Sequence, residues 1–479
     1  MAKTVRNAVR EIAREPRQHL STLLICAVAV FFGAAMIAGT QLLAHLIAGP
    51  EGADGAEGGI ALMLGLLGTV FFGIAIFVAA IVVVNTFSIV VAGRTRTIAL
   101  LRLLGASAPS LRRGIGVEGL IVGGVGAVLG TVLADVAALG AAAWLEHRPD
   151  AAPLGFAITP GTAVPGAVVV LMAWWAAWRG ARPVLAVSPI EGTRRTVEPA
   201  LKTLRRGSRA LLVLALLGIV LGAGLLGLGV LVGFASSAGV LLGFLGGIVS
   251  FTGIALGSAW IMPAFLGLAG LPLRASAAGR LAAGSARRHP LRASRTSMGL
   301  VIGITLIMMF ATLGQTFQTV MTRWSRELGI AEDQTSSVMR SIDDVLWFLT
   351  AMLVFSLVIA AIGVVNNMQA SVMQRTRELG MLRTIGLSTA GLWRMILAET
   401  AQLTLAAALF AIPLGILYGW CGALSMLASV DGIGFFLPTP PWVMIGLVLL
   451  GCAVITGIAA ALPARRVTRV SPVAALAAD

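Results

Sequence analysis

Ten apolar runs divide this chain, and each is long enough to cross a lipid bilayer as a helix, which needs roughly 20 apolar residues. A soluble protein has no use for so many runs of this length, and the whole chain is 58% hydrophobic and 11% charged. We therefore expect an all-α polytopic membrane protein with small extracellular loops. The expected spans are about 19–48, 60–92, 114–145, 162–181, 209–234, 238–270, 294–320, 345–372, 395–428 and 441–463.

The basic residues gather on one side of these spans. Of the 35 lysines and arginines, 31 face the side of the N-terminus, and the other four are Arg148, Arg323, Arg326 and Arg340. This asymmetry is the positive-inside pattern, so we expect a cell-membrane protein with both termini in the cytoplasm. It also argues against a nucleic-acid partner, which would need basic residues clustered on a folded soluble face.

Residues that could catalyse a reaction or hold a metal are sparse. The three cysteines lie in apolar segments, and neither they nor the dispersed histidines have metal-ligand spacing. A P-loop needs a lysine after glycine, but the chain's lysines are Lys3 and Lys202, and Lys202 follows a leucine. We expect no catalytic residue, no metal and no cofactor in this chain, and any ATP hydrolysis to come from a separate polypeptide.

One stretch of the chain occurs twice, at 94–118 and 375–399, without a gap and at an offset of 281. Eleven of its 25 positions are identical, and the cytoplasmic ends ARPVLAVSPIEG and ARRVTRVSPVAAL are also alike. Such an internal repeat indicates duplicated structural units. We expect a first repeat at 1–183, a linker with two spans at 184–273, and a second repeat at 274–479.

Both repeats are expected to begin in the same way and to have the same topology. Each starts with a basic amphipathic helix, which Pro16 or Pro290 separates from the first spanning helix. Four spans follow in each repeat, and each repeat enters from the cytoplasm. The two repeats are therefore expected to be related by an axis along the membrane normal.

The duplicated stretch predicts a cytoplasmic elbow between the second and third spans of each repeat. Gly105 can end one helix in the left-handed conformation, and Ser107 can cap the next. Gly386 and Ser388 repeat this pattern. The arginines by themselves could simply anchor the spans at the membrane surface. Glycine, serine and glutamate that recur at the same spacing in both copies favour a rigid docking element instead. The candidate docking residues are Arg94, Arg96, Arg102, Gly105, Ser107, Arg375, Arg377, Glu378, Arg383, Gly386 and Ser388.

The box RTRELGMLRTIGLS at 375–388 resembles that of the FtsX/MacB-type ABC transporter permease family. The order of one span, an outward segment and three spans is similar too, and ten spans resemble the 4+2+4 members of the family. The resemblance implies that both elbows contact a cytosolic ABC ATPase, in two copies, which binds ATP and Mg. Thr97 stands where the second copy has Glu378, so the two docking sites are expected to differ.

The expected function is that of a permease subunit, which couples ATP hydrolysis by its partner to export or extraction of an amphiphilic substrate. A lipid, a lipopeptide, a peptide antibiotic or a drug would fit. The chain lacks the large outward domain of many members, which leaves the substrate open. Two alternatives stand: ATP-driven signalling to an extracytoplasmic partner protein, and secondary transport without an ATPase, which would need charge relays near the membrane midplane.

A few polar residues are expected inside the membrane, where they are costly and often functional. Glu118 and Glu399 match at the repeat offset, and each follows an arginine, Arg113 or Arg394, that can pair with it. Structural pairing is the favoured interpretation, and a transport role is the other. Further polar candidates, favoured as interhelical or interfacial contacts, are Asp135, Asn85 and Asn366.

Overall fold

The computed structural model describes the main helical segments of the chain. These are residues 16–48, 95–146, 160–182, 201–236, 239–288, 290–327, 381–430 and 432–469, with the shorter pieces 76, 79–80, 83–84, 87, 329, 358, 361–365, 368 and 372. Every regular element among these residues is a helix, and eight helices are long and apolar enough to span a membrane. The chain is therefore an all-α, multi-pass membrane protein.

The chain forms two compact units, which are described separately below. The first consists of residues 1–198 with 358–363, and the second of residues 199–357 with 364–479. The two inserted spans therefore group with the second repeat. The expected three-part division at 183 and 273 stays a prediction.

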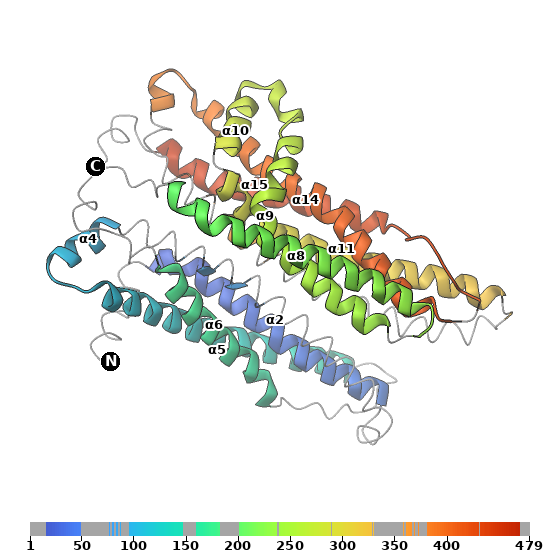
Figure 1. Cartoon of the computed structure of the whole chain (residues 1–479). Coiled ribbons are helices and arrows are strands. Elements are labelled where there is room, and N and C mark those ends of the chain that lie inside the picture. Colours follow the sequence, from blue (N-terminus) through green and yellow to red (C-terminus); the bar gives the residue numbers. More distant parts are fainter. Residues whose placement is uncertain are drawn as a thin grey trace. The chain divides into compact units, whose positions relative to one another are not determined.

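Three long helices build the described part of the first unit (Figure 1). They are α2 (Pro16–Ala48), α5 (Ala108–Glu146) and α6 (Val164–Gly180), with the short α4 (Thr95–Leu103) before α5 and the 3-10 turn η1 (Pro160–Ala163) before α6. Each of the three long helices packs against the other two. They correspond to the first, third and fourth spans expected from the sequence.

Glycines on two sides of α5 allow its neighbours to approach closely. A Cβ at Gly123 would lie 2.8 Å from the Cβ of Ala173 on α6, and one at Gly126 would lie 2.8 Å from the Cβ of Cys26 on α2. Small residues at such spacing let helix backbones pack in lipid, where no hydrophobic force drives them together. Helix α5 is therefore in close contact with both α2 and α6.

Helix α14 is the centre of the second unit (Figure 1). It packs against α11, α15, α9, α10 and α8. The unit contains α8 (Leu201–Gly233), α9 (Gly239–Ala269), η3 (Pro272–Ala275), α10 (Ala277–Arg288), α11 (Pro290–Glu327), α14 (Thr389–Leu427) and α15 (Trp442–Arg469). Gly415 of α14 faces α11, where an added Cβ would lie 2.7 Å from the carbonyl oxygen of Thr305.

Buried hydrogen bonds join α14 to its neighbours. The hydroxyls of Ser250 on α9 and Tyr418 on α14 lie 2.8 Å apart, and Gln402 Nε2 donates to the Leu266 carbonyl of α9 over 2.8 Å. The hydroxyl of Thr404 lies 2.7 Å from that of Thr456 on α15. Polar contacts of this kind hold helices together in a membrane, so the inserted helices are fastened directly to the second repeat.

The eight described spans agree with the sequence, with some different ends. Helix α8 begins at Leu201 rather than near 209, and α11 continues to Glu327 rather than 320, because a spanning helix need not stop at the bilayer surface. The expected break at Pro290 is confirmed, since α10 ends at Arg288 and α11 begins at Pro290. The expected spans 60–92 and 345–372 lie largely outside the described residues, and the N-terminal amphipathic helix up to residue 15 lies wholly outside them.

Candidate functional site

The first elbow joins α4 to α5 through a tight, fully hydrogen-bonded turn. The Ala106 amide donates to the Leu101 carbonyl over 2.9 Å, and the Gly105 amide donates to the Arg102 carbonyl over 3.1 Å. Gly105 has a φ of 95°, in the left-handed region that other residues rarely adopt. This pair of hydrogen bonds is a Schellman motif, which ends a helix and fixes the direction of the chain that follows.

The second elbow repeats this turn atom for atom. The Leu387 amide donates to the Leu382 carbonyl over 3.0 Å, and the Gly386 amide donates to the Arg383 carbonyl over 3.1 Å. Gly386 has a φ of 106°. The left-handed glycines expected from the sequence are therefore confirmed in both copies.

A serine then caps the helix that leaves each elbow. Ser107 Oγ accepts a hydrogen bond from the Ser110 amide at 3.4 Å, and Ser388 Oγ accepts one from the Gly391 amide at 3.1 Å. These caps are also as expected, and each satisfies a backbone donor that the helix start leaves unpaired. The helices that follow, α5 and α14, have 39 residues each. Each elbow is thus a rigid continuation of a long spanning helix.

Each elbow presents one aliphatic side chain almost completely to its surroundings. Leu104 is 85% exposed and Ile385 is 83% exposed, and the two positions match at the repeat offset of 281. An apolar side chain at the tip of a rigid, basic turn is the kind of group that anchors a protein interface. Sequence reasoning missed both residues because it followed the arginines. The signal available was an aliphatic residue directly before the turn glycine in both copies.

The remaining elbow residues predicted from the sequence are only partly visible. Arg102 and Arg383 are half-buried at equivalent points of the two turns. Arg96 lies in α4, with its side chain outside the described part of the chain. The other four predicted docking residues are also outside it: Arg94, Arg375, Arg377 and Glu378.

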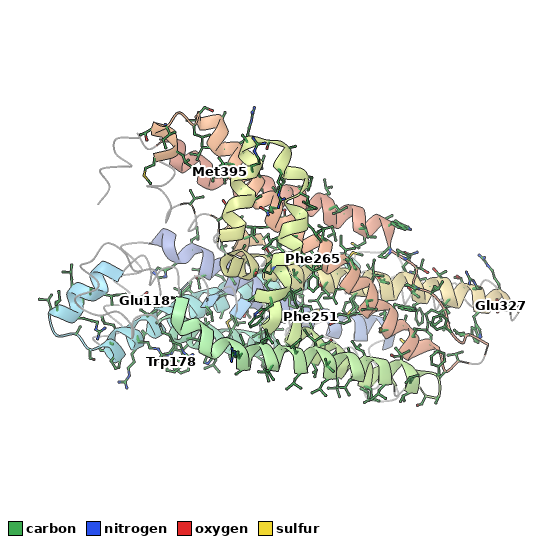
Figure 2. All side chains as sticks on the ribbon, turned by 45° about the horizontal axis from the view of Figure 1, so that its top comes forward. Glu118, Trp178, Phe251, Phe265, Glu327 and Met395 are labelled. Carbon is green, nitrogen blue, oxygen red and sulfur yellow. The ribbon has the colours of Figure 1, made fainter. Side chains whose placement is uncertain are left out.

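Glu118 has a different partner from the one that the sequence suggested. It is buried on α5 (Figure 2). Its Oε2 lies 3.9 Å from Nε2 of His19 on α2. Arg113, the expected partner, is exposed. The pair joins two helices, which favours the structural interpretation of Glu118. Its counterpart Glu399 is half-buried on α14, and when Pro16 is aligned with Pro290, Ala293 stands at the position of His19.

The other polar candidates are less informative. Asp135 is half-buried, and its Oδ1 has no hydrogen-bond partner in the described part of the chain. Asn85 and Asn366 lie outside that part. Among the described residues, no group of three or more His, Cys, Asp or Glu side chains could hold a metal ion.

Comparison with known proteins supports the duplicated architecture. Two segments, 69–183 and 350–472, match the model of the FtsX-like permease C-terminal family. Each segment contains one elbow and the helix that follows it, so both copies are matched independently.

Curated relatives resemble a shorter stretch of the chain. The pyoverdine export ATP-binding/permease protein PvdT of Pseudomonas putida is 33% identical over 132 residues, which is 27% of this chain and 19% of that protein. The macrolide export ATP-binding/permease protein MacB of Escherichia coli K12 is 34% identical over 133 residues, 28% of this chain and 19% of that protein. The chain thus spans about a fifth of the length of the curated relatives it matches.

Both matched segments contain an elbow with the same hydrogen-bond pattern. The match to this family and the similarity to MacB and PvdT agree with the helical membrane fold. The chain belongs to the FtsX/MacB-type family of ABC transporter permeases.

Proposed function

We propose that this chain is the membrane permease of an ATP-driven transporter and that its two elbows are the docking sites for a separate ATPase. The observation that carries the proposal is the pair of matched elbows, each with a left-handed glycine, a serine cap and an almost fully exposed aliphatic side chain directly before the glycine. A turn that served only to connect two spans would need none of these features in duplicate.

The ATPase is proposed to be a separate subunit in two copies. The sequence contains no Walker A motif that could bind the phosphates of ATP, so the nucleotide and its Mg are assigned to the partner. Two elbows offer one contact to each of two ATPase copies. In this view the permease contributes no catalytic residue, and both chain termini lie in the cytoplasm with the elbows.

The proposed coupling is mechanical. ATP binding closes the two ATPase copies on each other and draws the elbows together. Because each elbow is a closed hydrogen-bonded turn fused to a spanning helix, α5 and α14 move with it. Close glycine contacts then pass that motion to α2 and α6 in the first unit and to α11 in the second.

An amphiphilic cargo fits the chain best. The relatives are named for export, of pyoverdine and of macrolides, which favours export over signalling. The predicted outward loops are short, so a cargo taken from the membrane itself, such as a lipid, lipopeptide or hydrophobic drug, is the proposed substrate class.

A charge-reversal experiment tests the docking proposal. Arg96→Glu combined with Arg377→Glu is expected to abolish co-purification of a Walker A-containing partner from native membranes while the chain still inserts. Arg209→Glu, an exposed arginine of α8 on the same predicted side but outside both elbows, is the matched control and should retain the partner. Unchanged co-purification with the double variant would refute docking at the elbows.

Stimulation of the partner separates transport from signalling. With the complex in nanodiscs, an exported amphiphile is expected to raise the ATPase rate and to appear in the acceptor compartment. A rise in ATPase rate with an extracytoplasmic protein, and no movement of any amphiphile, would contradict the transport part of the proposal.

A further inference from the structure

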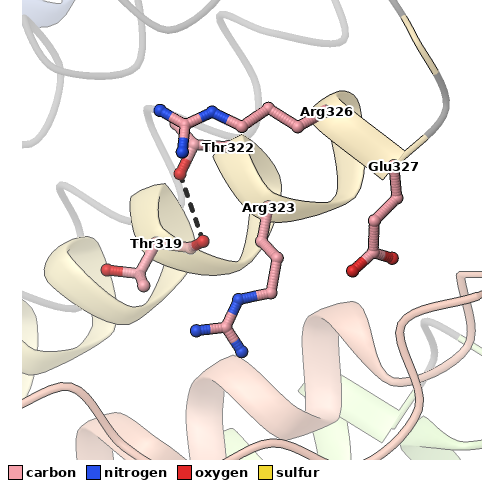
Figure 3. A pocket seen from close by; sticks show the side chains of 5 residues that line it. All are labelled: Thr319, Thr322, Arg323, Arg326 and Glu327. Carbon is pink, nitrogen blue, oxygen red and sulfur yellow. Dashed lines mark hydrogen bonds between the residues drawn. The ribbon is translucent and has the colours of Figure 1, made fainter.

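A basic pocket lies at the C-terminal end of α11 (Figure 3). It has a volume of about 360 Å³ and is lined by Thr319, Thr322, Arg323, Arg326 and Glu327. Arg323 and Arg326 are exposed and three residues apart, which places them on neighbouring positions of one helix surface. In Figure 3 the guanidinium group of Arg326 extends back along the helix towards Thr322, and that of Arg323 extends to the other side of the view.

The pocket is at the end of the second unit opposite its elbow. Figure 2 places Glu327 at one end of this unit and Met395, near the start of α14, at the other. The contacts agree, since Thr439, in the loop after α14, donates its amide to Thr316 Oγ1 over 3.1 Å. If the elbows face the cytosol, as proposed above, the pocket faces the outer leaflet. Only this assignment of the pocket to the outer side rests on the proposed function.

The lining of this pocket carries two guanidinium groups and one carboxylate, so its net charge is positive. In the described part of the chain neither arginine forms an ion pair, and neither does Glu327. The threonine hydroxyls donate to helix carbonyls, Thr319 to Gln315 over 2.7 Å and Thr322 to Gln318 over 2.8 Å, so the arginines are the hydrogen-bond donors that remain in this pocket. Guanidinium groups bind phosphate oxygens through paired, charge-assisted hydrogen bonds, so two neighbouring arginines are suited to hold a phosphate group.

An exposed apolar loop lies beside this end of α11. The loop between α14 and α15 exposes Phe435 by 64% and Leu437 by 72%. Two hydrogen bonds hold this loop in place. Trp420 Nε1 donates to the Phe436 carbonyl over 2.9 Å, and the Thr439 amide donates to Thr316 Oγ1. A fixed apolar surface next to a cationic pocket complements a molecule with a phosphate at one end and hydrocarbon at the other.

We propose that this pocket binds the phosphate group of a membrane lipid headgroup. Arg323 and Arg326 contact the phosphate oxygens, and the acyl chains lie along the apolar loop that carries Phe435 and Leu437. Because the net charge of the lining side chains is positive, an anionic phosphate monoester is the preferred headgroup. The site would hold lipid at the outer end of α11, the helix that packs on α14.

Lipid binding to the purified full chain in detergent tests the proposal without any ATPase. Dihexanoyl phosphatidic acid is compared with dihexanoylglycerol, which has the same chains and no phosphate, and with inorganic phosphate. We expect phosphatidic acid to bind at least about tenfold more tightly than either compound, because only it uses both parts of the site. Arg323→Gln with Arg326→Gln should reduce its affinity to that of dihexanoylglycerol.

Two further variants keep the result interpretable. Arg323→Lys with Arg326→Lys preserves the charges and should retain most of the binding, and Arg148→Gln, at another arginine predicted to face outward, should leave it unchanged. Wild-type affinity in the double Gln variant would overturn the proposal. So would equally tight binding of inorganic phosphate, which would make this a site for free anions rather than lipid. Failure here would leave docking of the ATPase at the elbows untouched.

Discussion

The guanidinium group of Arg112 lies over the ring of Trp178, with its carbon 3.5 Å from the ring centroid. Its Nε also donates to the Trp178 carbonyl over 2.9 Å. Arg112 is in the first turns of α5, directly after the first elbow, and Trp178 is near the end of α6. The contact therefore ties the first elbow to the fourth span of its repeat. The second repeat has Trp393 at the position of Arg112, so it cannot form the same contact.

Replacement of Arg112 tests how firmly that elbow is held. Arg112→Gln should lower the free energy of unfolding by about 1 kcal/mol, because the cation–π contact and the hydrogen bond to Trp178 are lost. Thermal unfolding in detergent measures the change, and Arg113→Gln, at the exposed neighbouring position, is the matched control. Equal effects of the two variants would show that the stacking contributes nothing specific.

Substitution of the turn glycines tests the shape of the elbows. Gly105→Ala and Gly386→Ala should each cost about 1 kcal/mol, because alanine is strained at φ values of 95° and 106°. No atom lies within 4 Å of the added Cβ at either position, so crowding is excluded as the cause. Gly114→Ala, in α5 and equally open, is expected to be neutral or stabilising, since alanine favours a helix. Thermal unfolding of all three variants measures these changes, and a loss of stability in Gly114→Ala equal to that in the two elbow variants would contradict the prediction.

Packing of α11 against α14 depends on Gly415. A Cβ there would lie 2.7 Å from the Thr305 carbonyl oxygen, closer than real contacts allow, so Gly415→Val should force the helices apart. We expect a loss of at least about 2 kcal/mol or failure to yield folded protein. Gly446→Val on α15, where nothing lies within 4 Å, should behave like the wild type in size-exclusion chromatography. Folded Gly415→Val protein with unchanged stability would contradict the close approach.

The inserted helices are expected to depend on one buried hydrogen bond for part of their attachment. In a double-mutant cycle, Ser250→Ala and Tyr418→Phe should show a coupling energy of about 0.6 kcal/mol, typical of such contacts in membranes. Unfolding in a mixture of mild and denaturing detergents provides the free energies. Simple additivity of the two single changes would mean that the 2.8 Å contact does not contribute.

Much of the fold could be predicted from the sequence, because apolar length and turn chemistry are local properties. The hydropathy of the chain gave the eight described spans, and Gly105, Gly386, Ser107 and Ser388 predicted both elbow turns. Exposure is not local, so the sequence did not single out Leu104 among so many leucines.

Contacts between distant segments could not be predicted either. His19 and Glu118 are 99 residues apart, and nothing in their surroundings marks them as a pair. The basic pocket was also missed. Arg323 and Arg326 were noted as rare outward charges, but the pocket that they line together with Thr319 and Thr322 depends on how far α11 continues beyond the expected end at 320.

The exposed tips of the elbows should contribute most to docking of the ATPase. Leu104→Asp and Ile385→Asp should each weaken its binding by about 2 kcal/mol, because an anchor in a desolvated pocket is replaced by a charge. Both positions are almost fully exposed, so the chain itself should fold normally. Titration of the purified ATPase against each variant in nanodiscs gives the two affinities, and they need not be equal, since Thr97 and Glu378 differ between the elbows.

Site-specific photo-cross-linking tests the central claim most directly. A photoreactive amino acid is placed at Leu104 in one sample and at Ile385 in another, and each complex is irradiated in native membranes. The account predicts that both positions cross-link to the same Walker A-containing ATPase, and that Leu241, an exposed leucine on α9, does not. Cross-links from both elbow positions to lipid alone, with none to an ATPase, would contradict it.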